Sequence, residues 1–133
     1  MKERMNDTYY IGYEGQPEIS FFFESPTEKN ILKMWIGYFE MLLDLMTQYA
    51  PSDEDILHVY CAHEGWYDES PWEIQNIDAA IRLFESFDLN KASGEQLEQV
   101  KNIVPDIPGV AHQITAFLEK AITNGCKVYI EYD

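Results

Sequence analysis

Residues 25–49 have the sequence SPTEKNILKMWIGYFEMLLDLMTQY, which contains the most apolar part of the chain, residues 31–46. The first four match a capping box, in which Ser25 and Glu28 satisfy free amides at a helix start and Pro takes the first helical position. Polar residues then recur every three or four positions and leave most of a helix circumference apolar; they are Lys29, Lys33, Gly37, Glu40, Asp44 and Gln48. The stretch predicts a helix over residues 26–49, either at the centre of the core or with one side against another chain.

Segments rich in Tyr, Ile, Phe and Val on both sides of this helix predict strands. Residues 8–13 and 18–24 flank a Glu-Gly-Gln-Pro turn and predict an antiparallel hairpin. Residues 56–62, ILHVYCA, predict a buried third strand, and the strand–helix–strand order implies a right-handed crossover to a parallel neighbour. Residues 126–132 predict a closing strand in which Val128, Ile130 and Tyr132 share one face.

Three further helices are predicted after the third strand. Ser70-Pro-Trp-Glu73 repeats the capping box and predicts a helix over residues 71–87. Residues 95–104 predict a short polar helix, and residues 108–124 a longer one that Gly125 ends in a left-handed conformation. The order β-β-α-β-α-α-α-β predicts one α/β (α+β) domain over residues 1–133, with a mixed sheet of about four strands and helices packed against it.

The composition indicates a folded domain with an acidic surface. The 133 residues include 24 Asp and Glu against 9 Lys and Arg, for a formal net charge of −15 and a pI near 4.3. A hydrophobic content of 46% argues against disorder. Direct contact with nucleic-acid phosphate or anionic lipid is not expected, since both attract cationic side chains. A cationic protein partner fits better, and the plain alternative is that the charge only confers solubility.

The sequence predicts a cytoplasmic protein without a membrane span. Residues 31–46 are too few to cross a bilayer and are interrupted by charged side chains. The first residues carry charges but lack the apolar core of a secretion signal. Without such a signal, Cys61 and Cys126 predict two buried thiols in a reducing cytosol rather than a disulfide.

The acidic residues are unevenly distributed along the chain. No Lys or Arg occurs in the 48 residues from Met34 to Ile81, which contain ten carboxylates. Within that span, residues 64–73 have the sequence EGWYDESPWE, in which two Trp and one Tyr stand among four acids. This segment carries the strongest functional signal of the chain.

No catalytic, metal or cofactor motif accompanies this segment. His58, Cys61, His63 and Glu64 lie close in sequence, but on a strand His58 would point away from Cys61 and His63, so a metal site is not expected. A reactive Cys61, paired with His63 or His112, would need nearby positive charge, which the span lacks. Carboxylate pairs occur by chance among so many acids, and no glycine-rich phosphate loop is present. We therefore expect a protein that is not an enzyme and has no cofactor.

The candidate partner-binding residues combine aromatic anchors with carboxylates. Trp, favoured at binding hot spots, would bury a large area against a partner, and acids around it would steer a cationic protein. The alternative is that both Trp side chains pack beneath the loop and the acids only favour a helix N-terminus. The two can also be combined, with Trp72 inside and Trp66 outside. The candidates are Asp53, Asp55, Glu64, Trp66, Tyr67, Asp68, Glu69, Trp72 and Glu73.

In overall format the chain resembles bacterial immunity proteins that neutralise toxins of contact-dependent growth inhibition and other polymorphic toxin systems. The nearest features to signatures are Ser70-Pro-Trp-Glu73 and the closing Gly125-Cys-Lys-Val-Tyr-Ile-Glu-Tyr132. The resemblance implies an inhibitor of one cognate toxin domain, often a basic nuclease, whose phosphate-binding surface meets carboxylates.

Three other interpretations remain open. A nucleic-acid mimic that blocks a restriction or defence enzyme would need acids spaced like backbone phosphates. A small enzyme or ligand-binding domain would show a deep polar pocket that collects His58, His63 or His112. A dimer through the long apolar helix would use its free side, so the chain is predicted to be a monomer or a dimer of this kind.

Overall fold

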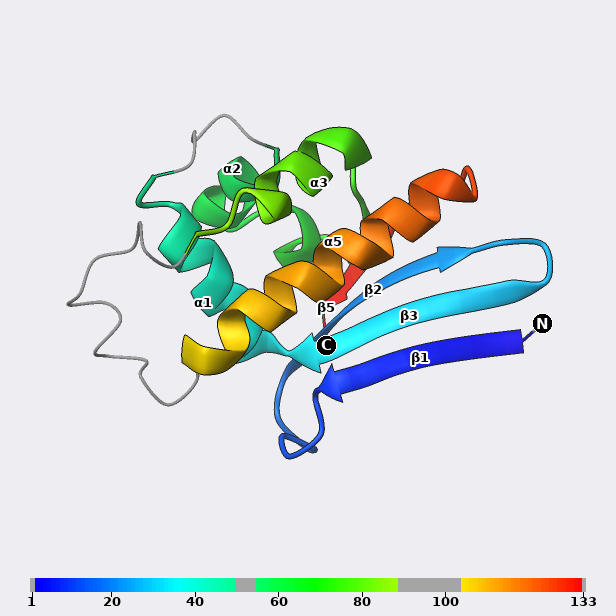
Figure 1. Ribbon diagram of the computed structural model, residues 1–133, viewed down its shortest axis with the longest axis horizontal. Coiled ribbons are helices and arrows are strands. Elements are labelled where there is room, and N and C mark those ends of the chain that lie inside the picture. Colours follow the sequence, from blue (N-terminus) through cyan, green and yellow to red (C-terminus); the bar gives the residue numbers. More distant parts are fainter. Residues whose placement is uncertain (1, 50–54, 89–103, 133) are drawn as a thin grey trace.

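The protein is a five-stranded mixed sheet with helices packed against it, as seen in the computed structural model, which describes residues 2–49, 55–88 and 104–132 (Figure 1). The strand order is β1-β3-β2-β5-β4. This confirms the predicted class, with five strands instead of about four. In chain order the elements are β1 (Lys2–Tyr9), β2 (Glu18–Glu24), β3 (Glu28–Trp35), α1 (Ile36–Met46), α2 (Asp55–Ala62), η1 (Gly65–Tyr67), β4 (Trp72–Glu73), α3 (Ile77–Glu85), η3 (Val104–Asp106), α5 (Ile107–Thr123) and β5 (Tyr129–Tyr132).

Residues 25–49 are not one helix but a strand, β3, followed directly by the helix α1. In β3, burial alternates, with Asn30, Leu32 and Met34 facing the core. The Ser25 hydroxyl does accept a hydrogen bond from the Glu28 amide at 3.1 Å, but this contact closes the β2–β3 turn instead of starting a helix. The capping-box prediction was wrong because the same side-chain contact stabilises either structure.

The first hairpin was also paired wrongly. Strand β1 begins at Lys2 and lies parallel to β3, whereas β2 runs antiparallel to β3 on one side and to β5 on the other. Strand β1 is mostly exposed, as expected of an edge strand, and its polar sequence carried no apolar alternation to reveal it. Its Arg4 side chain forms an ion pair with Glu28 of β3, with 2.7 Å between Nε and Oε2.

Residues 56–62 form the helix α2 instead of a buried strand, so the predicted crossover connection is absent there. Ile56 and Leu57 are buried, whereas His58 and Cys61 are exposed, which is a helical pattern of burial. A short apolar run fits a strand or a buried helical turn equally well. Both cysteines are free, but neither is the buried thiol that was predicted: Cys61 is exposed on α2, and Cys126 is half-buried.

The last third of the chain follows the sequence pattern more closely. Strand β4 and a loop occupy the start of the predicted helix 71–87, and α3 begins only at Ile77, where the Asn76 side chain accepts from the Ala79 amide at 3.0 Å. Helix α5 and strand β5 confirm the two closing predictions, with Gly125 at φ 67° after the helix. The predicted helix 95–104 lies outside the described residues, except for Val104 in η3.

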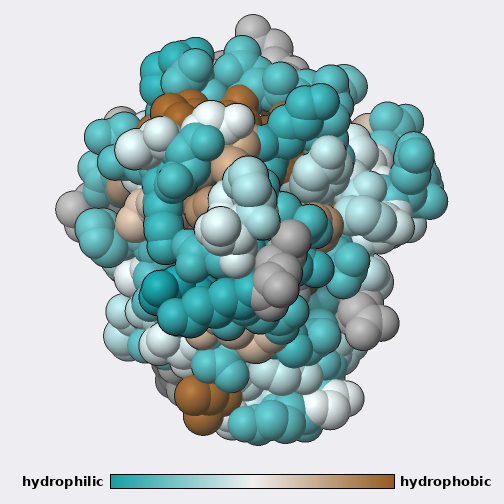
Figure 2. Space-filling model, turned by 90° about the vertical axis from the view of Figure 1, so that its right-hand side faces the viewer, coloured by the Kyte–Doolittle hydropathy of each residue, from teal (hydrophilic) through white to brown (hydrophobic). Residues whose placement is uncertain are grey.

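Helix α1 occupies the centre of the core, as predicted. Seven of its side chains are buried, and Phe39 makes edge contacts with Phe21 of the sheet and with Trp66. Met41 is its only half-exposed large apolar side chain, so α1 has little apolar surface left for a second chain. The face shown in Figure 2 is mostly hydrophilic, and its apolar atoms form separate patches. Within the described ranges, no helix combines the length and apolar character needed to cross a membrane.

Candidate functional site

Two tyrosines form hydrogen bonds that connect the carboxylates of α1, Glu40 and Asp44, to the segment that follows this helix. The Tyr60 hydroxyl on α2 donates to an Asp44 carboxylate oxygen at 2.6 Å, and the Tyr67 hydroxyl on η1 donates to the Glu40 carboxylate. Burial, and then the neighbouring carboxylate, raise the pKa of Tyr60 and of Tyr67. Both phenols therefore remain hydrogen-bond donors at neutral pH, and both carboxylates are held in fixed positions.

The turn between α2 and η1 brings an imidazole ring onto this cluster. His63 follows α2 in the left-handed conformation, with φ 57°, and its ring stacks on that of Tyr67 at 4.0 Å between centroids. Gly65 follows with φ 62°, and a Cβ there would collide with Val59 and press on the Trp72 ring. The turn thus needs glycine both for its backbone conformation and for close packing.

Trp66 is a core residue and not a partner anchor. It is 1% exposed, and its ring meets Phe39 and Trp72 edge-on, each at 5.6 Å. Trp72, on the edge strand β4, is half-buried. Trp66 is therefore fully packed beneath the loop and Trp72 only partly, so the combined interpretation with Trp72 inside and Trp66 outside was wrong. A helical turn between Gly65 and Tyr67 points the middle side chain inward, and sequence composition does not reveal that direction.

The carboxylates of the loop face solvent. Glu64, Asp68 and Glu69 are exposed, and Glu73 is half-buried on β4 beside Tyr129 of β5. The loop backbone is anchored by the Asp68 and Glu69 amides, which both donate to the Gly65 carbonyl. These acids therefore project from a structured turn.

Two of the candidate contact residues, Asp53 and Asp55, precede the rest of the site in the chain. Asp53 lies outside the described residues. Asp55 is the first residue of α2, and its side chain is also outside what the structure describes. These two predicted contact residues are consequently not assigned to the surface.

A further aromatic residue joins the cluster from the C-terminal strand. The Tyr132 ring lies 5.4 Å from that of Tyr67, and its amide donates to the Ser70 hydroxyl at 2.7 Å. Tyr132 is 38% exposed. The sequence interpretation placed it on one face of the last strand with Val128 and Ile130, and the pairing of β5 with β2 and β4 brings it here. No local sequence signal predicts that contact.

We define the acidic-aromatic surface as the exposed or half-exposed side chains that these contacts connect, together with the exposed carboxylates of the adjoining turn, Glu64, Asp68 and Glu69. Sequence reasoning missed Glu40, Asp44, Tyr60, His63 and Tyr132, because it assigned them to other roles in a long helix or in strands. The full set is Glu40, Asp44, Tyr60, His63, Glu64, Tyr67, Asp68, Glu69 and Tyr132.

Among the described residues, no Lys or Arg forms an ion pair with the carboxylates of this surface. Between described residues there are two ion pairs, Arg4–Glu28 and Lys33–Glu18, and both lie on the sheet. The surface itself belongs almost entirely to the span without Lys or Arg. Carboxylates close together without counter-charge raise the local negative potential and favour a cationic ligand.

The histidines and cysteines do not converge on a reactive centre. His58 and Cys61 are exposed on α2, His63 stacks on Tyr67, and His112 lies on α5. In the part of the chain that the structure describes, no three His, Cys, Asp or Glu side chains are placed to hold a metal ion. Of the three histidines, His112 alone lines the cavity between α5 and the sheet.

No protein-family model matches this chain, and no curated protein or solved structure matches it either.

Proposed function

We propose that this protein binds and neutralises a cationic protein, as immunity proteins neutralise toxin domains, and that it acts by binding and not by catalysis. The observation that carries the proposal is the group of exposed carboxylates, Glu64, Asp68 and Glu69, on a turn where no described Lys or Arg pairs with them. A partner that supplies Lys and Arg would relieve this like-charge crowding.

The tyrosines of the acidic-aromatic surface are suited to be the contact anchors that Trp66 is not. Tyr60 and Tyr67 are half-buried and donate to the carboxylates of Asp44 and Glu40. Tyr132 is exposed, and its ring lies 5.4 Å from that of Tyr67. Tyrosine is enriched at binding hot spots because it buries a large area with few rotatable bonds. A guanidinium could stack on such a ring while it pairs with an adjacent carboxylate.

The hydrogen bonds at the base of the surface support tight association. Glu40 and Asp44 are already oriented by Tyr67 and Tyr60, so they lose little side-chain freedom when a partner binds. A basic nuclease is a fitting partner, because its phosphate-binding Lys and Arg would meet carboxylates in place of nucleic acid. Such an inhibitor protects the producing cell, so we expect it to act in the cytoplasm.

The proposal can be tested with the protein encoded next to this gene. A secreted protein that ends in a toxic domain should stop growth when its final domain is expressed alone, and co-expression of this protein should restore growth. The two proteins should co-purify at low salt, and less well at high salt. A neighbouring toxic domain that kills equally in the presence of this folded protein, and does not co-purify with it, would refute the proposal.

A further inference from the structure

A cavity of about 320 Å³ lies between α5 and the strands β1 and β3. Its apolar wall includes Ile31 and Leu32 of β3 and Phe117 of α5. Its volume is at the lower end of the range typical of small-molecule sites. None of its lining residues belongs to the acidic-aromatic surface, so a ligand in this cavity is independent of the proposed function.

The charge of the cavity contrasts with that of the chain. Arg4, His112 and Lys120 contribute to the lining, and no carboxylate of the described residues does. In a chain with 24 acids and 9 Lys and Arg, such a site is unusual. The nearest carboxylate shown by the contacts is Glu28, which pairs with Arg4 through Nε at 2.7 Å. That hydrogen bond lowers the pKa of the Glu28 carboxyl, which is therefore ionised at neutral pH. Its single negative charge offsets part of the positive charge of Arg4 and Lys120.

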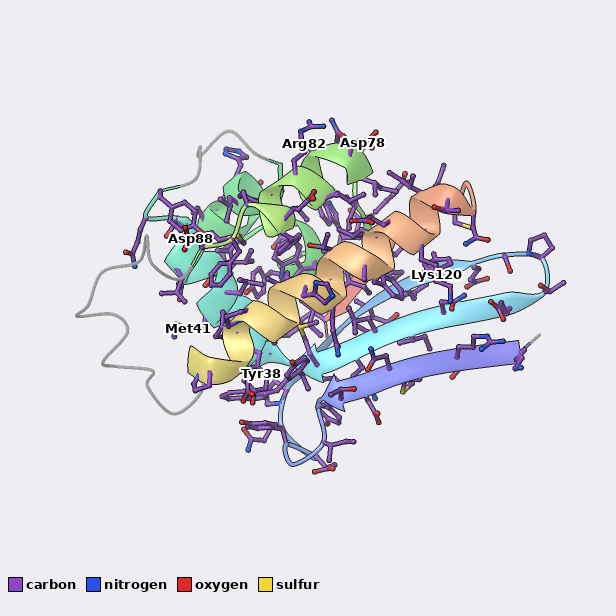
Figure 3. The ribbon with its side chains drawn as sticks, viewed as in Figure 1. Tyr38, Met41, Asp78, Arg82, Asp88 and Lys120 are labelled. Carbon is purple, nitrogen blue, oxygen red and sulfur yellow. The ribbon has the colours of Figure 1, made fainter. Side chains whose placement is uncertain are left out.

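The two cations retain donors that can reach a ligand. Arg4 uses Nε for Glu28, and its terminal guanidinium nitrogens form no hydrogen bond with any described residue. Lys120 extends from α5 toward β3 and donates to the Asn30 side-chain oxygen at 3.0 Å (Figure 3). Two further ammonium protons of Lys120 are not used by that contact.

Lys120 is held in this position by a buried amide. Asn30 is 4% exposed, and its nitrogen donates to the second Glu28 oxygen at 3.4 Å, which orients its oxygen toward Lys120. The chain Arg4–Glu28–Asn30–Lys120 therefore sets both cations at the cavity before any ligand arrives. Preorganised charged donors of this kind favour anions at low entropic cost.

We propose that this cavity binds a small organic anion, with its carboxylate or phosphate group against Arg4 and Lys120 and its apolar body against Phe117. Inorganic phosphate would make only the first set of contacts. A neutral aromatic molecule would make only the second. The expected ligand therefore carries both an anionic group and an apolar body.

The experiment is a titration of the full chain, followed by amide NMR shifts and calorimetry, with phenyl phosphate and benzoate as probes. At least one should bind about tenfold more tightly than inorganic phosphate or phenol, since it gains both a charge-assisted and an apolar contact. The amides that shift should be those of β1, β3 and α5. If neither phenyl phosphate nor benzoate binds more tightly than inorganic phosphate and phenol do, or if the shifted amides belong to other elements, the proposal is wrong.

Three variants test the residues. Lys120→Met and Arg4→Met should each weaken the better probe by about tenfold, as expected for the loss of one charged hydrogen bond. Ala116→Phe, which fills the cavity without removing a charge, should do the same. Arg82→Met on α3, outside the cavity, is the matched control and should leave affinity unchanged. Equal binding by the control and by a folded Arg4→Met or Ala116→Phe variant would overturn the assignment.

Discussion

The Tyr60 hydroxyl donates to the Asp44 carboxylate at 2.6 Å and so joins α2 to the central helix α1. The two residues are 16 positions apart. The sequence predicted a strand for the segment of Tyr60, and it placed Asp44 on the polar side of a long helix. The bond fixes one edge of the acidic-aromatic surface. It also makes the stability of the protein depend on the protonation of a tyrosine.

We expect Tyr60→Phe to lower the free energy of unfolding by about 1 kcal/mol at pH 7, the typical net value of one hydrogen bond. The pH dependence should change as well. The pKa of Tyr60 is raised in the folded protein, so its contribution is full below the unfolded pKa of about 10 and is lost as pH rises above that value.

Urea unfolding from pH 7 to pH 11 measures both effects. The wild type should lose stability above pH 10 more steeply than Tyr60→Phe. Tyr129→Phe is the matched control, because the Tyr129 hydroxyl makes no hydrogen bond with a described residue and its ring stacks on Phe22 at 5.3 Å. Parallel curves for Tyr60→Phe and the wild type would contradict the assigned contact.

Trp66→Ala should be strongly destabilising, by about 3–5 kcal/mol, because it removes the largest fully buried side chain and leaves a cavity beside Phe39. Trp72→Ala, at a half-buried position, should cost less. Chemical denaturation with tryptophan fluorescence measures both values. Wild-type stability for Trp66→Ala would mean that this ring is a surface anchor after all.

Gly109 of α5 tests the docking of β1. A Cβ at this position would collide with the hydroxyl of Tyr9, which is the last residue of β1. We therefore expect Gly109→Ala to lower stability in the wild type, although alanine favours helices by up to about 1 kcal/mol. With Tyr9→Phe already present, the same change should be neutral or stabilising. The double-mutant cycle measures the coupling, and zero coupling would show that the two residues do not meet.

The fold class could be predicted from the sequence, but the division of residues 25–49 into the strand β3 and the helix α1 could not. Lys29 and Lys33 are four residues apart, and this spacing puts two side chains on one side of a helix and equally on one face of a strand. The apolar pair Ile56 and Leu57 was ambiguous in the same way. Helix α5 could be predicted because its periodicity lasts for almost five turns and a glycine ends it.

The candidate site shows the same limit. Composition identified the acidic turn at Glu64, Asp68 and Glu69, whose side chains are exposed. It could not show that Trp66 points inward, since that depends on one short helical turn. It also could not bring Tyr132 to Tyr67, because strand pairing across more than sixty residues is set by the tertiary fold.

The central claim is that the exposed carboxylates attract a cationic protein, so the direct test is association kinetics with the toxic domain that the proposal expects to be encoded beside this gene. Asp68→Lys/Glu69→Lys reverses two charges on the surface. Glu85→Lys/Glu119→Lys makes the same change in net charge at exposed positions on α3 and α5. Stopped-flow measurements at about 10 mM and about 150 mM ionic strength compare the association rates of these two double variants with that of the wild type.

We predict that the first variant associates about tenfold or more slowly than the wild type at low ionic strength, that added salt narrows this difference, and that the control stays close to the wild type. Equal association rates for Asp68→Lys/Glu69→Lys and the wild type at low ionic strength would contradict the account.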